Sequence, residues 1–279
     1  MNYQQWLQQA IMTLTPYSSS PRCDAEALLS HMTQQSRATL LAFSETLLSQ
    51  PRQQALSDWL TRRVQGEPIA YLTGEREFWS LPLQVTPATL IPRSETELLV
   101  EQALQRLPQT ACRLLDLGTG SGAIALALAK ERPDCQIIAT DCCQQALAVA
   151  QHNAQCLQLT NVRFLQGDWF APLARQRFQM IISNPPYLDT EDPHWQQGDL
   201  RFEPRQALVA AEQGLAALQQ IIRQAADYLL PSGWLLVEHG WQQGEAVATQ
   251  LQQAGYRQVA TLTDLAEHPR ISLGQWPNV

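Results

Sequence analysis

From Arg113 onward the sequence alternates strand-like runs with helix-like runs, and this alternation constrains the fold more than any other feature. The strand-like runs are 114–116, 136–140, 162–166, 178–183, 234–238, 258–262 and 271–275. The helix-like runs are 122–130, 144–157, 215–230 and 245–254, with another at 95–107 before the first strand. Strands that alternate with helices predict an α/β fold with a parallel sheet covered on both faces.

The segment before this alternation is organised differently. Apolar residues recur at helical spacing in residues 1–66, and Asp24 and Pro51 are suited to open two of the helices. Residues 67–92 are interrupted by Pro68, Gly74, Pro82, Pro87 and Pro92. The sequence therefore predicts a helical bundle over 1–66, a linker with short strands over 67–92, and an α/β domain over 93–279.

Composition limits the classes of function. The chain is 45% hydrophobic and 16% charged, which is sufficient for a normal core, and its formal net charge is -7. An acidic total argues against a protein that grips nucleic-acid phosphates, so we expect no direct nucleic-acid binding. None of the six cysteines forms a CxxC pair, and no signal peptide or apolar run of about 20 residues is present. We therefore expect a cytoplasmic protein with reduced thiols, no membrane span and no metal site.

The run DLGTGSG begins at Asp116, after the first strand-like run, and opens a helix. Gly118, Gly120 and Gly122 permit unusual backbone dihedrals and close approach of a ligand, and N–H groups at a helix start favour an anion. Asp141, at the end of the second strand-like run, is placed to accept hydrogen bonds from ribose hydroxyls. The turn predicts an adenosine-containing cofactor. It fits a dinucleotide through its pyrophosphate and S-adenosylmethionine through its carboxylate equally well.

Asp168 and Trp169 follow the third strand-like run. Asp168 could read an adenine edge, and Trp169 could pack on the face of the base. A tryptophan that simply fills the core is at least as good an interpretation of the pattern.

The fourth strand-like run ends directly in Asn184-Pro185-Pro186-Tyr187. The prolines lack N–H groups and favour extended backbone, so the loop is stiff and presents carbonyl oxygens. The side-chain oxygen of Asn184 and the carbonyl of Pro185 are suited to hold both hydrogens of an –NH2 group, while Tyr187 stacks on the flat group behind it. Fixing those hydrogens aims the delocalised lone pair at an electrophile. The loop predicts a flat –NH2 acceptor but does not choose between an amide and an adenine.

Four segments together resemble the PrmC/HemK family of protein-(glutamine-N5) methyltransferases. They are GEPIAYLTGEREFWSLPL from Gly66, IPRSETELL from Ile91, DLGTGSGAIALALA from Asp116 and NPPY from Asn184. The resemblance covers nearly the whole chain. It implies a Rossmann-like class I methyltransferase sheet with an N-terminal helical bundle, with S-adenosyl-L-methionine as the methyl donor.

The resemblance also implies a substrate and a set of contacts. Family members methylate the glutamine of the Gly-Gly-Gln motif in bacterial peptide chain release factors, modulating translation termination, and the bundle helps to recognise the release factor. The implied cofactor contacts are Gly118, Thr119, Gly120, Ser121, Gly122, Asp141, Trp169 and Asn184. The implied substrate contacts are Asn184, Pro185, Pro186 and Tyr187, with Asn184 and Pro185 catalytic.

Rival interpretations remain open at this stage. A ribosomal-protein glutamine methyltransferase would use the same loop on a related substrate. A DNA or RNA adenine methyltransferase would share it as well, but it needs a basic track for the strand. A nicotinamide-dependent oxidoreductase accounts for the glycine turn and gives the Asn-Pro-Pro-Tyr loop no role.

Overall fold

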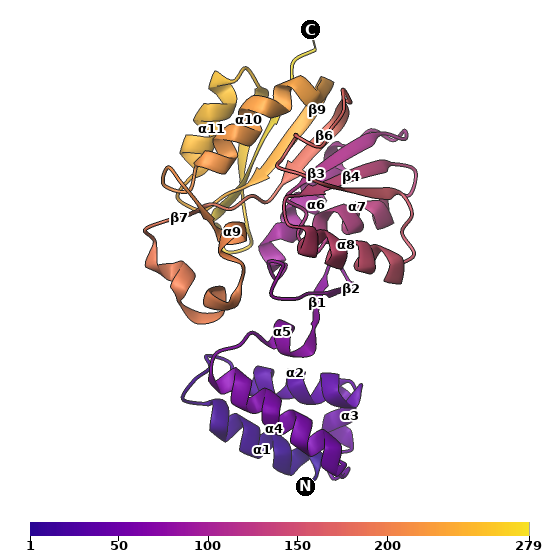
Figure 1. The fold of residues 1–279 in the computed structure, drawn as a ribbon, viewed down its shortest axis with the longest axis vertical. Coiled ribbons are helices and arrows are strands. Elements are labelled where there is room, and N and C mark those ends of the chain that lie inside the picture. The colour runs from indigo at the N-terminus through magenta and orange to yellow at the C-terminus, as the bar shows by residue number, and fades with distance from the viewer. Residues whose placement is uncertain (279) are drawn as a thin grey trace. The chain divides into compact units, whose positions relative to one another are not determined.

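The computed structural model describes residues 1–278, and the chain divides into two compact units (Figure 1). The helical unit comprises Met1–Glu75 and Gln197–Phe202. The α/β unit comprises Arg76–Gln196 and the residues from Glu203 onward. None of the helices within residues 1–278 combines the length and apolar character that a membrane crossing requires.

The helical unit contains five α-helices. They are α1 (Tyr3–Leu14), α2 (Pro21–Thr33), α3 (Arg37–Ala42), α4 (Gln50–Val64) and α5 (Ile69–Thr73). Its core is built from apolar side chains of all five, including Trp6, Leu28, Leu56 and Leu72. The sequence placed the end of this bundle near residue 66. In the structure the helical unit continues to Glu75, because Leu72 of α5 is buried in the same core.

Two helix starts were predicted in this unit. Proline lies in the first turn of α4, as expected from Pro51. The expectation that Asp24 caps α2 was wrong, because α2 begins three residues earlier at Pro21. Asp24 instead accepts hydrogen bonds from Ser18 and from the guanidinium of Arg63 at 2.8 Å each, which ties α2 to α4.

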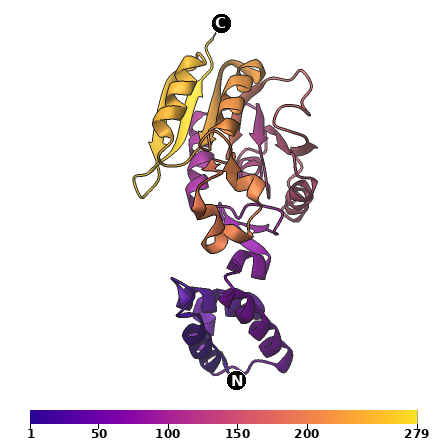
Figure 2. The same cartoon turned by 60° about the vertical axis from the view of Figure 1, so that its left-hand side comes forward.

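The α/β unit is built on a seven-stranded sheet with the order β10-β11-β9-β6-β3-β4-β5. Its strands are β3 (Arg113–Leu117), β4 (Gln136–Asp141), β5 (Val162–Gln166), β6 (Phe178–Ser183), β9 (Leu229–Glu238), β10 (Arg257–Thr263) and β11 (Pro269–Gln275). Strands β5, β4, β3, β6 and β9 pair in parallel, and β11 runs antiparallel to both of its neighbours. Figure 2 shows the yellow C-terminal strands at one edge of the unit.

The sheet is therefore mixed, and the expectation of a wholly parallel sheet was wrong at one edge. Only residues 264–268 connect β10 to β11. A parallel crossover needs a dozen or more residues, so this short connection enforces an antiparallel pair.

Helices cover both faces of the sheet. On one face α6 (Glu97–Arg106) and α7 (Ala123–Glu131) pack on a core that includes Leu114, Ile137 and Met180. On the other face α10 (Ala216–Tyr228) and α11 (Gly244–Gln253) pack on the alternate residues of the same strands. This two-sided burial explains why the central strands read as continuous apolar runs.

Shorter elements complete the fold, and one of them, the 3-10 helix Gly198–Phe202, belongs to the helical unit. The predicted linker contains the two-stranded sheet β1 (Glu75–Phe78) and β2 (Leu81–Gln84). Helix α8 (Gln144–Cys156) and the 3-10 helix Ser94–Thr96 flank the sheet. The segment after the Asn-Pro-Pro-Tyr loop, which the sequence left unassigned, forms β7 (Leu188–Asp189), two 3-10 helices at Pro193–Gln196 and Gly198–Phe202, α9 (Arg205–Leu208) and β8 (Val209–Ala210).

Candidate active site

The glycine turn joins the end of β3 to the start of α7. Gly118, Gly120 and Gly122 have φ values of +71°, +56° and +87°, in the left-handed region that glycine adopts without strain. The N–H groups of Gly118 and Thr119 both donate to the carbonyl of Thr140 at 2.9 Å, which fixes the turn against β4. The three glycines are therefore required by the backbone, because each adopts a positive φ that other residues adopt only with strain.

Asp116, on β3, holds this turn through Thr119. Its carboxylate is buried and accepts a 2.6 Å hydrogen bond from the hydroxyl of Thr119, while its other oxygen has no hydrogen-bond partner among the described residues. Burial raises the pKa of Asp116 to about 7, against the lowering effect of the Thr119 hydroxyl. Asp116 thus fixes Thr119 from within the core and does not itself line the cavity.

Asp141 lies at the carboxyl end of β4. One carboxylate oxygen accepts from the N–H of Gly120 at 2.9 Å, and the other accepts from the N–H of Cys143 at 2.8 Å. Burial raises the pKa of Asp141, and these two backbone hydrogen bonds oppose the shift. Each oxygen keeps a second lone pair, so the carboxylate can still accept from two neighbouring hydroxyls.

Trp169 lies just beyond the carboxyl end of β5. Its backbone has a φ of +44°, and its carbonyl accepts a 3.2 Å hydrogen bond from the hydroxyl of Thr140. A Cβ placed on Gly118 would meet the Trp169 ring at 3.4 Å. The indole therefore lies beside the glycine turn and is also partly packed on the core. Its contact with the base of a cofactor stays a prediction.

The Asn-Pro-Pro-Tyr loop leaves the carboxyl end of β6, next to β3 in the sheet. The amide nitrogen of Asn184 donates to the hydroxyl of Thr96 at 3.2 Å. The backbone of Tyr187 donates to the carbonyl of Leu208 at 3.2 Å and accepts from Gln243 at 3.0 Å. These contacts hold the loop at both ends, as a site that must position an acceptor requires.

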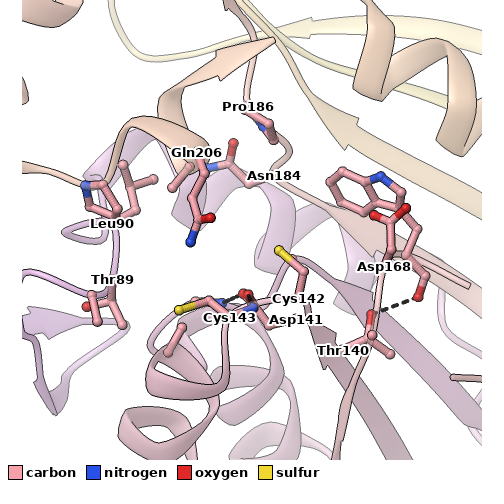
Figure 3. Close-up of a pocket in the computed structure, with 18 residues that line it drawn as sticks. Thr89, Leu90, Thr140, Asp141, Cys142, Cys143, Asp168, Asn184, Pro186 and Gln206 are labelled. Atoms are coloured by element: carbon pink, nitrogen blue, oxygen red, sulfur yellow. Dashed lines mark hydrogen bonds between the residues drawn. The ribbon is translucent and has the colours of Figure 1, made fainter. Parts of the chain in front are cut away.

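A cavity lies between the turn and the loop and encloses about 690 Å³, counting the part that opens to solvent. Figure 3 shows Asn184 and Pro186 on one side of this cavity, with Asp141 and Cys142 across from them. Its position beyond the carboxyl ends of the parallel strands is where α/β sheets bind ligands.

The predicted site residues divide into two groups around this cavity. Those that line it are Gly118, Gly120, Asp141, Trp169, Asn184 and Pro186. Thr119, Ser121 and Gly122 lie behind it: Thr119 bonds Asp116, the Ser121 carbonyl accepts from Asn153, and Gly122 packs close to Leu126. Pro185 and Tyr187 also lie outside the lining. Direct ligand contacts at all eleven positions, whether in the lining or behind it, stay predictions.

Several residues of the site were not found from the sequence. Thr96 accepts a hydrogen bond from Asn184 and donates one to Glu238. Glu203 accepts from the N–H of Ile91 at 2.9 Å and forms an ion pair with Arg93. Glu203 thereby fixes the segment that carries Leu90 into the cavity wall. One available signal was that Glu238 ends a sheet strand, because carboxyl ends of strands gather at one edge.

S-adenosylmethionine fits the residues present. The glycine turn leaves open space at Gly120, where a Cβ would meet nothing within 4 Å. The two free lone pairs of Asp141 match a ribose diol, and the Trp169 ring offers an apolar surface beside the turn. When bound, this cofactor supplies an electrophilic methyl group on a sulfonium.

Comparison with known proteins places this site in a class. A family model described as a methyltransferase domain matches residues 108–269. A methyltransferase from Pyrococcus furiosus superposes with a TM-score of 0.55 at 18% identity, covering 80% of this chain and 100% of that chain. The Thermus thermophilus 16S rRNA N2 G1207 methyltransferase, solved with AdoMet and guanosine, also gives 0.55, at 19% identity over 72% of this chain and 49% of that chain. The fold, the turn and the matched domain define an S-adenosylmethionine-dependent methyltransferase.

The family follows from the whole chain. A model described as the PrmC N-terminal domain matches residues 5–74. The release factor glutamine methyltransferase of Escherichia coli (strain K12) is 58% identical over 276 residues, covering 99% of both chains. That of Vibrio cholerae is 50% identical over 260 residues, covering 93% of this chain and 91% of that protein. The chain belongs to the family of release factor glutamine methyltransferases, as the sequence motifs indicated.

Proposed function

We propose that this enzyme transfers a methyl group from S-adenosylmethionine to the side-chain amide nitrogen of the glutamine in the Gly-Gly-Gln motif of peptide chain release factors. The observation that carries the proposal is the 58% identity to the Escherichia coli release factor glutamine methyltransferase over 99% of both chains. It extends through the N-terminal domain, for which the family resemblance implies a role in release-factor recognition. A cytoplasmic location goes with this substrate.

The Asn-Pro-Pro-Tyr loop provides the chemistry for such an acceptor. Asn184 lines the cavity, and its amide nitrogen is held by Thr96, which leaves its side-chain oxygen to accept one N–H of the substrate amide. The carbonyl of Pro185 is assigned to the second N–H. These two acceptors stabilise the positive charge that grows on the nitrogen as the carbon–nitrogen bond forms. The carbon–sulfur bond of the donor would break as the carbon–nitrogen bond forms, and the strongly acidic N-methylated amide would lose one proton to water. Alignment therefore supplies much of the rate, and no strong base is required.

The assay uses the purified full-length enzyme with labelled S-adenosylmethionine. We expect label in a release factor, located on the Gly-Gly-Gln glutamine by peptide mass spectrometry, and none in the same release factor with that glutamine changed to alanine. Ribosomal protein and nucleic acid are parallel acceptors. Label only in ribosomal protein would favour the sister glutamine activity, and label only in DNA or RNA would overturn the assignment.

Asn184→Ala tests the role of the loop in the same assay. We expect methyl transfer to fall at least about 100-fold, because one of two fixed acceptors is lost, while cofactor binding survives in part. Asn278→Ala is the matched control, since Asn278 is exposed and does not line the cavity. An Asn184→Ala enzyme with the parent rate would refute the geometric argument.

A further inference from the structure

A chain of hydrogen bonds runs from the Asn-Pro-Pro-Tyr loop into the protein interior. The amide nitrogen of Asn184 donates to the Thr96 hydroxyl at 3.2 Å. That hydroxyl lies 2.7 Å from one carboxylate oxygen of Glu238, and the hydroxyl of Tyr187 lies 3.3 Å from the other. Thr96 and Glu238 are 4% and 2% exposed, and neither lines the cavity. They cannot contact a substrate, so any effect they have on catalysis acts through Asn184 or Tyr187.

The direction of this chain is set by the number of protons available. An ionised carboxylate only accepts hydrogen bonds, so Glu238 takes the single proton of the Thr96 hydroxyl. Thr96 can then only accept from Asn184, and only the –NH2 end of the Asn184 amide can donate to it. The oxygen end of that amide is thereby turned away from Thr96.

We propose that Thr96 and Glu238 are positioning residues that lock the Asn184 amide in the orientation presenting its oxygen to the acceptor nitrogen. This inference deepens the proposed function and rests on it. The two ends of an asparagine amide are nearly equal in size, so packing alone discriminates poorly between them. A flipped Asn184 would point –NH2 at the –NH2 of the acceptor, which replaces a hydrogen bond by two opposed donors.

The protonation state of Glu238 gives a second way to test the orientation of the Asn184 amide. Burial raises its pKa to about 7, while the hydroxyls of Thr96 and Tyr187 and the charge of Arg270 lower it and Glu95 raises it. A protonated Glu238 can donate to Thr96, which frees the threonine proton to point at Asn184 and reverses the amide. Methyl transfer should therefore rise with pH through about 7.

The test compares Thr96→Val and Glu238→Gln with the conservative Thr96→Ser. With a release factor as acceptor, we expect the first two to lower kcat about 10- to 100-fold, with KM for S-adenosylmethionine within about threefold of the parent. Thr96→Ser keeps the hydroxyl and should stay within about threefold in kcat. Glu238→Gln should also lose the rise in kcat near pH 7, because a glutamine does not titrate.

A readout that needs no acceptor separates this inference from the proposed function. Nuclear magnetic resonance of the Asn184 side-chain amide should show slow hydrogen exchange in the parent and in Thr96→Ser, and fast exchange in Thr96→Val. If this pattern holds while no release factor is methylated, the amide lock stands and the substrate proposal fails. Unchanged exchange and kcat in Thr96→Val, or parallel losses of cofactor binding and kcat that Thr96→Ser does not rescue, would overturn the inference.

Discussion

Asp141→Asn tests how the glycine turn and β4 together hold the ribose of the cofactor. In the parent, each Asp141 oxygen accepts one backbone N–H, from Gly120 at 2.9 Å and from Cys143 at 2.8 Å, and keeps one lone pair for a ribose hydroxyl. The amide of asparagine has one oxygen. Its –NH2 group would face a backbone N–H on one side and cannot accept from a hydroxyl on the other.

The magnitude follows from the bond that the cofactor loses. A hydrogen bond to a charged acceptor contributes about 1.5–3 kcal/mol, so the Kd for S-adenosylmethionine should rise about 10- to 150-fold. Burial raises the pKa of Asp141, so its charge is partly desolvated. Because the neutral asparagine no longer carries this desolvation cost, we expect the rise in Kd to lie near the lower end of this range.

Isothermal titration calorimetry with S-adenosylmethionine measures the change directly, with urea unfolding as a check on the fold. Asp134→Asn is the matched control, because Asp134 makes its ion pair with Arg132 and does not line the cavity. A Kd for Asp141→Asn within threefold of the parent would refute the assignment of this carboxylate to the ribose.

Three further predictions concern the same turn. Asn153→Ala removes two hydrogen bonds to Gln84 and one to the Ser121 carbonyl, all between 2.8 and 3.0 Å, so the free energy of unfolding in urea should drop by about 2–4 kcal/mol; a loss below about 1 kcal/mol would contradict it. Gly118→Ala introduces strain of about 1–2 kcal/mol at φ +71° and places a Cβ against Trp169, so titration with S-adenosylmethionine should show binding weakened at least about tenfold. Gly255→Ala is the control, because it is strained at φ +94° but its Cβ meets nothing, and it should bind the cofactor normally. Burial raises the pKa of Asp116 to about 7, from about 3.9 in the unfolded chain, so between these pH values the native state holds a proton that the unfolded state has lost. The free energy of unfolding should therefore fall as pH rises from about 4 to about 7. Urea unfolding of Asp116→Asn should show a flatter pH dependence, and the same pH dependence as in the parent would argue against a neutral buried carboxyl.

The alternation of strands and helices was predictable because it is a local property. Strands β5 and β6 occupy the predicted ranges 162–166 and 178–183, and most other elements differ by a few residues at their ends. Apolar runs bounded by glycine and proline are typical of strands buried on both faces, and helical spacing of apolar residues marks the covering helices. The antiparallel direction of β11 was missed because strand direction depends on the length of a connection and on pairing across the sheet.

The glycine turn and the Asn-Pro-Pro-Tyr loop were also found from the sequence alone. Their chemistry resides in consecutive residues, since left-handed glycines and donor-free prolines act through their own backbone. The resemblance of four segments to one family then supplied the substrate class, and the identity over the full chain confirmed that family. The sequence by itself therefore determined the fold class, the cofactor class and the two halves of the site.

Only the tertiary structure decided what stands behind those halves. Thr96, Asn184 and Glu238 come from three separate segments, and their sequence separations are 88 positions for the first two and 142 for the first and last. Likewise, the structure separated Gly118 and Gly120, which line the cavity, from Ser121 and the other turn residues behind it. Hydrogen bonds across such separations and the burial that perturbs a carboxyl pKa depend on three-dimensional packing, and no local pattern of residues encodes them.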